Sequence, residues 1–446
     1  MRGRTNILGG GGGAVVNGQI KDFKVADGNN ISVGDFVTMI SGPASYYDVQ
    51  NYSFDLSGES KVFKISNSKC ALFYGVNIMI LDLSNGIVLD KIISGTFHTV
   101  RKQNVYQIDS NHFAILYNES STSISVDVVE VDYENNTSSF DTKIYNYEES
   151  VAGYSDIYYF AINVGNIIFL PYSKSSSKIF SIIWIDVNSG EFGRCDVSNS
   201  SNVDYFLNNG CLVNGEEGFL YVFSTGLNNT SPKSVYVSKL YFSSEEKSLT
   251  LLGQYSIYTE KVHKYIRLGG TVCYLGNNNF ALSTSTGIEI LKIEDNITQL
   301  NFIQGIRSGL IFNYDDYLLL FEQTLTSGTG HNQIVYYGVI SINDITTFNS
   351  IELQQFSFVD IFVPYAPDTY TLGLLDFENK FIVYGFSRSS SSTPARFVEC
   401  KLENENIVGM DSENYVTSYN GKALGFAKTG GNAGDTIKVY VPYDNN

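Results

Sequence analysis

The chain has 446 residues, enough for one large domain or two, and its 46 acidic and 29 basic side chains give a formal net charge of −17. This excess of negative charge argues against nucleic acid and anionic membrane surfaces as partners, because their phosphates attract lysine and arginine and repel carboxylates. Tyrosine and phenylalanine are abundant, proline and methionine are scarce, and no segment has extended helical periodicity, so the composition indicates an all-β protein.

Residues 1–18 are rich in glycine, with an unbroken glycine run at residues 9–13. Such a segment cannot form a core, so we expect a flexible arm. Arg2 and Arg4 make the arm basic in an otherwise acidic chain, so it either settles in a groove of an acidic neighbour or stays disordered. We find no apolar signal core at the start of the sequence and expect no secretory route.

Two strands are expected next, at residues 19–26 and 31–40, with a turn between them. The following segment, residues 43–409, repeats one pattern: an apolar, aromatic-rich strand, then a polar turn and two further strands. The aromatic-rich strands are residues 70–74, 113–117, 167–170, 219–223, 280–282, 317–321 and 381–384. They recur about every 50 residues, and a period in this range with several strands per unit predicts a β-propeller of about seven blades.

The pattern changes again beyond the propeller, where residues 422–442 read as two strands joined by a glycine-rich turn. Ile437, Val439 and Val441 alternate there and place one apolar face inward. A hairpin alone is marginal in water, and a propeller brings its first and last blades side by side. We therefore predict that residues 19–42 and 410–446 form one small β-domain, into which the propeller is inserted.

The terminal segments contain three short glycine-bearing motifs: residues 31–37 carry a Gly-Asp strand, residues 423–427 a Gly-x-Ala strand and residues 433–439 an Ala-Gly strand. In content and order, these motifs resemble the small β-domain of tailed-phage decoration, head-fibre and tail-fibre proteins. The glycine-rich start followed by residues 15–23 also resembles virion proteins from phages of clostridia and related bacteria. The resemblance covers about the first 40 and last 25 residues, and leaves out the propeller.

The resemblance implies a β-barrel or β-tulip domain that attaches the chain to a particle and makes it oligomeric, as a homotrimer. The residues concerned are Gly34, Asp35, Phe36, Gly425, Ala427, Gly434 and Asp435. Glycine at these positions suits sharp turns or close backbone approach, and an aspartate after such a glycine can bond the turn backbone. The implied partner is the phage major capsid protein or another virion protein.

Little in the sequence points to catalysis, and we predict neither an enzyme, nor a cofactor, nor a metal site. The four histidines lack metal-ligand spacing, and five cysteines without a Cys-x-x-Cys pair suit buried positions in a reducing cytoplasm. Acidic pairs for glycoside hydrolysis can only assemble in three dimensions. The candidates for such a pair are Asp156, Asp204, Asp315, Asp360 and Asp376.

Several segments interpreted as blade-edge loops combine tyrosines with small polar residues, a composition suited to glycan capture. The possible glycan contacts are Tyr46, Tyr47, Tyr154, Tyr158, Tyr258, Tyr365 and Tyr370. Blade-to-blade packing uses the same aromatic rings and is the simpler interpretation.

The sequence hypothesis is a structural component of a phage virion, assembled in the bacterial cytoplasm. The terminal domain would attach to the capsid, and the propeller would be displayed outward for decoration or for adhesion to host or environmental glycans. Two alternatives stay open: a tail-associated receptor-binding protein, and a propeller glycosidase acting on host surface polysaccharide.

Overall fold

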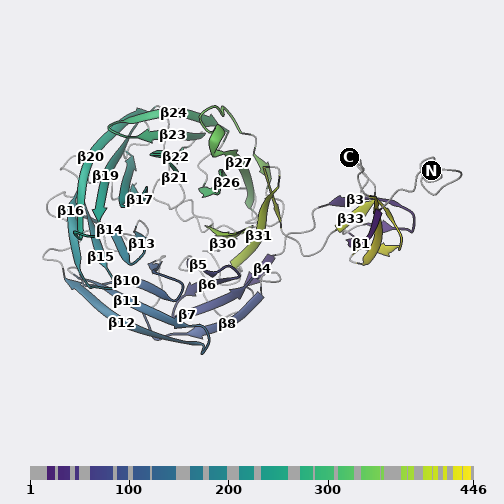
Figure 1. Cartoon of the computed structure of the whole chain (residues 1–446), viewed down its shortest axis with the longest axis horizontal. Coiled ribbons are helices and arrows are strands. Elements are labelled where there is room, and N and C mark those ends of the chain that lie inside the picture. Colours follow the sequence, from purple (N-terminus) through teal and green to yellow (C-terminus); the bar gives the residue numbers. More distant parts are fainter. Residues whose placement is uncertain are drawn as a thin grey trace. The chain divides into compact units, whose positions relative to one another are not determined.

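The described part of the chain folds almost entirely into β-strands, and these form two compact units, as the computed structural model shows (Figure 1). The structure describes residues 18–25, 29–40, 46–49, 61–83, 88–98, 104–120, 123–146, 161–173, 180–197, 210–225, 233–259, 272–284, 287–305, 310–325, 333–351, 353–355, 373–378, 380–385, 395–403, 405–409, 415–418, 425–433 and 435–442. The glycine-rich arm predicted for residues 1–18 lies outside them, except for Gly18. Among these residues there is no helix long and apolar enough to cross a membrane.

The larger unit is a β-propeller of seven antiparallel blades, as predicted. Its first four blades are β5–β8 (Lys61–Ser66, Lys69–Tyr74, Asn77–Asp82, Val88–Ser94), β9–β12 (Val105–Gln107, His112–Ser120, Ser123–Asp132, Thr137–Asn146), β13–β16 (Ile162–Val164, Ile167–Ser173, Phe180–Asp186, Phe192–Asp196) and β17–β20 (Gly210–Asn214, Phe219–Thr225, Lys233–Ser243, Ser248–Thr259). The others are β21–β24 (Val272–Gly276, Asn279–Ser283, Gly287–Ile293, Ile297–Gln304), β25–β28 (Leu310–Tyr314, Tyr317–Leu325, Gln333–Ser341, Gln354–Gln355) and β29–β32 (Gly373–Phe377, Lys380–Gly385, Ala395–Glu403, Asn406–Gly409).

The aromatic-rich strands are the second strands of their blades, so their prediction as first strands of a three-stranded unit was wrong. In every blade the first strand is no longer than the second, and the three-residue β9 and β13 are too short to show a periodic pattern. These first strands contact one another between neighbouring blades and lie toward the middle of the ring in Figure 1. The fourth strands lie at its outside, where β12 is mostly exposed.

The apolar cores lie between blades, because the second and third strands are buried on both faces. Between the first two blades, the rings of Phe73 in β6 and Phe113 in β10 have centroids 4.5 Å apart, and both side chains are fully buried. Cys70, Cys211 and Cys400 are likewise buried, and burial raises the pKa of the Cys70 thiol to about 12. These three cysteines therefore act as small hydrophobic residues, as the sequence indicated. Cys195 and Cys273 are only partly buried, so the prediction of buried positions does not hold for all five.

Side-chain amides join the first strands of successive blades around the ring. Gln107 Nε2 donates to the carbonyl of Lys64 at 2.7 Å, and Asn163 Nδ2 donates to the carbonyl of Gln107 at 2.6 Å. Asn214 Nδ2 lies 3.4 Å from the carbonyl of Asn163 and extends the same pattern to the fourth blade. Each bond satisfies a strand-end carbonyl of the preceding blade, so the blades are held in a common register.

The ring is closed by a strand from before the first blade. Strand β4, Tyr46–Val49, pairs antiparallel with the start of β31, in the last blade, with Val49 opposite Ala395 and Tyr46 opposite Val398. Lys380 Nζ also donates to the carbonyl of Leu83 at 2.8 Å, joining the last blade to the first. An edge of the last blade that would otherwise be open is therefore covered by chain from the other end of the propeller.

The smaller unit is a closed five-stranded barrel built from both ends of the chain. Its strands follow the order β1 (Gly18–Val25), β33 (Tyr415–Ser418), β3 (Phe36–Ile40), β34 (Gly425–Ala427) and β36 (Thr436–Pro442). A two-stranded sheet accompanies it, formed by β2 (Asn30–Ile31) and β35 (Gly431–Asn432). Phe23, Val37, Ile437 and Val439 are among its buried core residues. The alternation of Ile437 and Val439 predicted this inward face.

Candidate functional site

The two Gly-Asp segments of the barrel form matching turns. Asp35 Oδ2 accepts from the backbone N–H of Ser32 at 2.8 Å, and Asp435 Oδ2 accepts from the backbone N–H of Asn432 at the same distance. These are the side chain-to-backbone bonds that the sequence predicted. Gly34 has a φ of +84°, which favours glycine, and its N–H donates to the carbonyl of Ala427 at 2.7 Å. Gly434 lies outside the described residues.

Strand β34 joins these turns to the barrel wall. A Cβ atom on Gly425 would lie 2.0 Å from the carbonyl oxygen of Tyr440, so only glycine lets β34 and β36 approach this closely. Ala427 is 1% exposed and belongs to the barrel core. Gly425 and Ala427 therefore shape the barrel and are not positioned to touch a partner.

The outer face of the barrel carries a row of apolar side chains on four adjacent strands. Phe36 in β3 pairs with Phe426 in β34, Phe426 with Tyr440 in β36, and Tyr440 with Ile20 in β1. The rings of Phe426 and Tyr440 have centroids 5.1 Å apart, and Lys428 Nζ lies 4.7 Å from the centre of the Phe426 ring. Ile20 is 58% exposed. We call Phe36, Phe426, Tyr440 and Ile20 the barrel row; of these, the sequence marked only Phe36.

Three of the seven tyrosines considered for glycan contact lie in strands, so their interpretation as loop residues was wrong. Tyr46 and Tyr47 belong to β4, where pairing with β31 fixes the backbone, and Tyr258 belongs to β20, opposite Ser234. The strands form because alternating aromatic and small polar residues also suit a pleated edge. Tyr154, Tyr158, Tyr365 and Tyr370 lie outside the described residues.

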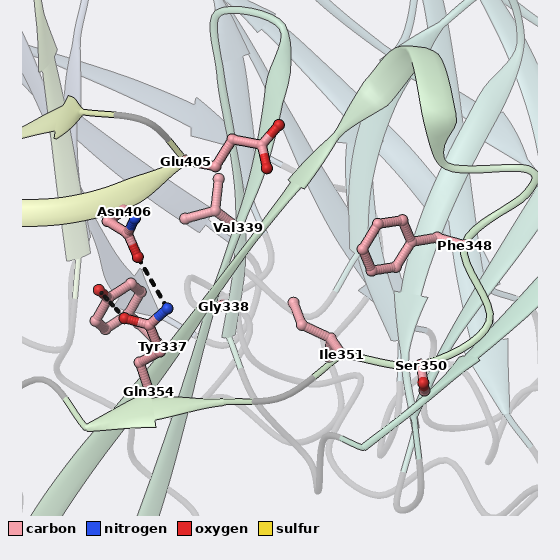
Figure 2. A pocket seen from close by; sticks show the side chains of 9 residues that line it. All are labelled: Tyr337, Gly338, Val339, Phe348, Ser350, Ile351, Gln354, Glu405 and Asn406. Carbon is pink, nitrogen blue, oxygen red and sulfur yellow. Dashed lines mark hydrogen bonds between the residues drawn. The ribbon is translucent and has the colours of Figure 1, made fainter.

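A pocket of about 290 Å³ opens on the outer side of the sixth blade. It is lined by Tyr337, Gly338, Val339, Phe348, Ser350, Ile351, Gln354, Glu405 and Asn406 (Figure 2). The pocket exists because the fourth strand of this blade is interrupted. Ser350 forms an isolated parallel β-bridge with Gln304 of the preceding blade. The chain pairs with β27 only from Gln354 onward, in β28. We call it the blade-6 pocket.

Hydrogen bonds fix the polar side of the blade-6 pocket. The Tyr337 hydroxyl donates to Gln354 Oε1 at 2.8 Å, and Gln354 Nε2 donates to Asn406 Oδ1 at 2.8 Å. Figure 2 shows these residues on one side and Phe348 and Ile351 on the other. Sequence reasoning missed this pocket because its walls come from two blades. The strand interruption that creates it also has no local sequence pattern that would predict it.

Two of the acidic residues considered for catalysis interact electrostatically: Asp376 lies in β29, and Asp315 lies in the turn between β25 and β26. Burial raises the pKa of Asp376, the negative charge of Asp315 raises it further, and Lys64 partly opposes the effect. Asp156, Asp204 and Asp360 lie outside the described residues. The described part of the chain contains no group of three or more His, Cys, Asp or Glu residues that could hold a metal ion.

One histidine is paired with a buried carboxylate. His98 Nδ1 lies 2.8 Å from Oδ2 of the fully buried Asp127, whose Oδ1 accepts from Thr142 Oγ1 at 2.7 Å and from the Tyr117 hydroxyl at 3.2 Å. The imidazole stacks on the Tyr117 ring at 3.7 Å. Because every contact shown is internal, this cluster anchors the connection that enters the second blade.

The sequence matches no protein-family model and no curated protein. Among solved structures, a functionally unknown protein from Desulfotomaculum acetoxidans has a TM-score of 0.46 and 9% identity, covering 77% of this chain and 96% of that one. The tricorn protease has a TM-score of 0.44 and 10% identity, covering 85% of this chain and 36% of that one. An oligogalacturonate lyase in complex with manganese has a TM-score of 0.40 and 11% identity, covering 87% and 99%. Likenesses this distant place no constraint on what this chain does.

Proposed function

We propose that this β-propeller protein is a structural component of a phage particle, attached through the barrel and displaying the propeller. The observation that carries the proposal is that both chain ends combine into one closed barrel, while the propeller closes on its own strand β4. One chain thus holds two self-contained units, and only the barrel has the turns and strands that resemble phage virion proteins. The partner is the major capsid protein or another virion protein, and the oligomer is a homotrimer.

The barrel row supports attachment through the barrel. It places four apolar side chains in register across adjacent strands, and a contiguous apolar patch on a soluble protein is a common feature of interaction surfaces. Aromatic residues are enriched at the centres of interfaces. The predicted basic arm would add contacts beside the barrel.

A matched pair of substitutions tests this attachment. Ile20→Asp places a charge on the barrel row, and Ile144→Asp places one on the outer strand β12 of the propeller; the two isoleucines are 58% and 55% exposed. We expect Ile20→Asp to abolish binding of the purified chain to particles that lack it, and Ile144→Asp to leave binding intact. Equal binding of both variants would contradict attachment through the barrel row.

Deletion of residues 2–13 tests the arm separately. We expect lower occupancy on particles, most strongly at low salt, because moderate salt already screens the charge attraction that the arm supplies. Unchanged occupancy at low and moderate salt would leave attachment to the barrel alone. Sedimentation analysis of the intact chain checks the trimer.

The glycosidase alternative is favoured by one observation, the neighbouring carboxyls of Asp376 and Asp315. A retaining or inverting glycosidase needs two such groups, one of them with a raised pKa. Incubation with host cell-wall polysaccharide should release no reducing ends if the proposal is right. Release that disappears in Asp376→Asn would establish the enzyme instead.

A further inference from the structure

The blade-6 pocket has two walls of opposite character. Phe348, Ile351 and Val339 form an apolar side, and Gln354, Asn406 and Glu405 form a polar one. Sugar rings combine an apolar C–H face with hydroxyls at the rim, and protein sites for them pair an aromatic ring with fixed amides and carboxylates. The volume of about 290 Å³ lies just below the range for small-molecule sites, roughly 300–1,000 Å³, which suits a ligand as small as one ring.

A hydrogen-bond chain orders the polar wall of the pocket. The Tyr337 hydroxyl donates to Gln354 Oε1 and Gln354 Nε2 donates to Asn406 Oδ1, both at 2.8 Å, so these side chains are held in place before a ligand arrives. Amides and carboxylates can bond sugar hydroxyls, since each hydroxyl both donates and accepts.

Gly338 makes the apolar wall possible. A Cβ atom at this position would lie 2.5 Å from Ile351 Cδ1 and 3.1 Å from Leu353 Cδ2. Ile351 itself is tied to blade 5, since its N–H donates to the carbonyl of Gln304 at 3.0 Å. A side chain at position 338 would therefore displace the Ile351 side chain from its place in the apolar wall of the pocket.

The charge of the pocket narrows the ligand class. None of the nine described residues that line it is basic, Glu405 is acidic, and the chain carries a net charge of −17. An anionic sugar would be repelled, and no cation of the lining would offset its desolvation. We propose that the blade-6 pocket binds a single neutral pyranose unit of a host or environmental glycan. This inference rests on the proposed function, and it names the class of ligand that the displayed propeller binds.

The direct test is titration of the full-length protein with glucose, galactose, N-acetylglucosamine and glucuronic acid. Binding is measured by calorimetry and by saturation-transfer NMR. We expect at least one neutral sugar to bind, with glucuronic acid at least about tenfold weaker. Phe348→Ser and Gly338→Ala should each weaken the neutral sugar at least about tenfold, with unchanged circular dichroism. Glu405→Gln keeps a hydrogen-bond acceptor but removes the negative charge. It should therefore reduce the difference in affinity between the neutral sugar and glucuronic acid.

Glu134→Gln is the matched control, because Glu134 lies in the corresponding turn between the third and fourth strands of the second blade. It should change nothing. The proposal is overturned if the unaltered protein binds no neutral sugar, if it binds glucuronic acid tightly, or if it binds only an extended peptide. It is also overturned if neutral-sugar binding survives both Phe348→Ser and Gly338→Ala. Particle occupancy is measured separately, so loss of sugar binding with normal occupancy refutes the pocket and leaves attachment standing.

Discussion

At the residue scale, the carboxylate of Asp186 shows how a buried charge can join two blades. Its side chain is 3% exposed, and Lys247 Nζ, from the next blade, lies 2.6 Å from Oδ2. Asn166 Nδ2 donates to Oδ1 at 2.6 Å. Burial alone would raise the pKa of Asp186, but the bonds from Lys247 and from the backbone of Ser189 and Asn188 outweigh it and lower the pKa to about 2. The ionised form is therefore the one that the fold stabilises.

Replacing the lysine should expose this dependence. We expect Lys247→Met to lower the free energy of unfolding of the propeller by about 1–3 kcal/mol at neutral pH, because a hydrogen-bonded charge loses its partner. The folded pKa is below that of an unfolded aspartate, about 3.9, so the stabilisation is present above that pH and lost as pH falls toward 2. Urea unfolding should be measured from pH 7 downward for the unaltered protein and for Lys247→Met. The difference between their free energies of unfolding should stay constant at first and decrease below about pH 4.

An exposed ion pair provides the control for this measurement. Lys292 Nζ lies 2.7 Å from Glu294 Oε1, with side chains 38% and 56% exposed. Lys292→Met should cost less than about 1 kcal/mol, since solvent screens such pairs. A cost equal to that of Lys247→Met would mean that burial of Asp186 has no energetic consequence.

Gly425 makes a second prediction at this scale. Gly425→Ala should destabilise the barrel by about 3 kcal/mol, because the new Cβ would meet the Tyr440 carbonyl and separate β34 from β36. Gly34→Ala is the comparison in the same barrel; it meets no atom within 4 Å and should cost only about 1–2 kcal/mol for the left-handed φ. Hydrogen exchange of the barrel amides measures both. Equal protection in the two variants would contradict the close approach of these strands.

Residue-level sequence reasoning succeeded where the chemistry is local. The bonds from Asp35 and Asp435 to their own turns span three residues, so the Gly-Asp pattern alone predicts them. The Asp127–His98 pair joins residues 29 apart in sequence, and the blade-6 pocket joins two blades, so no short-range pattern encodes either of them. Phe36 was identified within a strand, but its cross-strand neighbours depend on the barrel register.

At the scale of elements, the sequence located one strand of every blade and misassigned its position. Second strands such as β10 are buried by both neighbouring blades, so they are long apolar runs that stand out. First strands such as β9 are short, and β4 lies in a separate segment from the blade that it completes. The blade count therefore follows from the regular recurrence of these apolar strands, whereas strand order and ring closure depend on contacts between distant segments.

The closing strand can be tested by truncation. A fragment of residues 46–409 retains β4, and a fragment of residues 50–409 lacks it. We expect the shorter fragment to melt several degrees lower and to aggregate, because the edge of β31 at residues 395–398 is left open. Identical melting temperatures and solubility would show that β4 does not stabilise the ring.

At the scale of the whole molecule, barrel and propeller have separate cores. Such units should unfold independently, so calorimetry of the intact chain should show two transitions. Gly425→Ala should lower only the barrel transition, and Lys247→Met only the propeller transition. A single transition that both substitutions shift would contradict this independence.

The central claim is that the protein belongs to a phage particle, and immunogold labelling of purified, intact particles tests it most directly. Antibodies raised against residues 46–409 should label the heads of particles that contain the intact chain. They should leave unlabelled the particles that were assembled with the Ile20→Asp variant in place of the intact chain. Gold confined to tails would favour the receptor-binding alternative. Absence of the protein from gradient-purified particles, despite its presence in the lysate, would contradict the account.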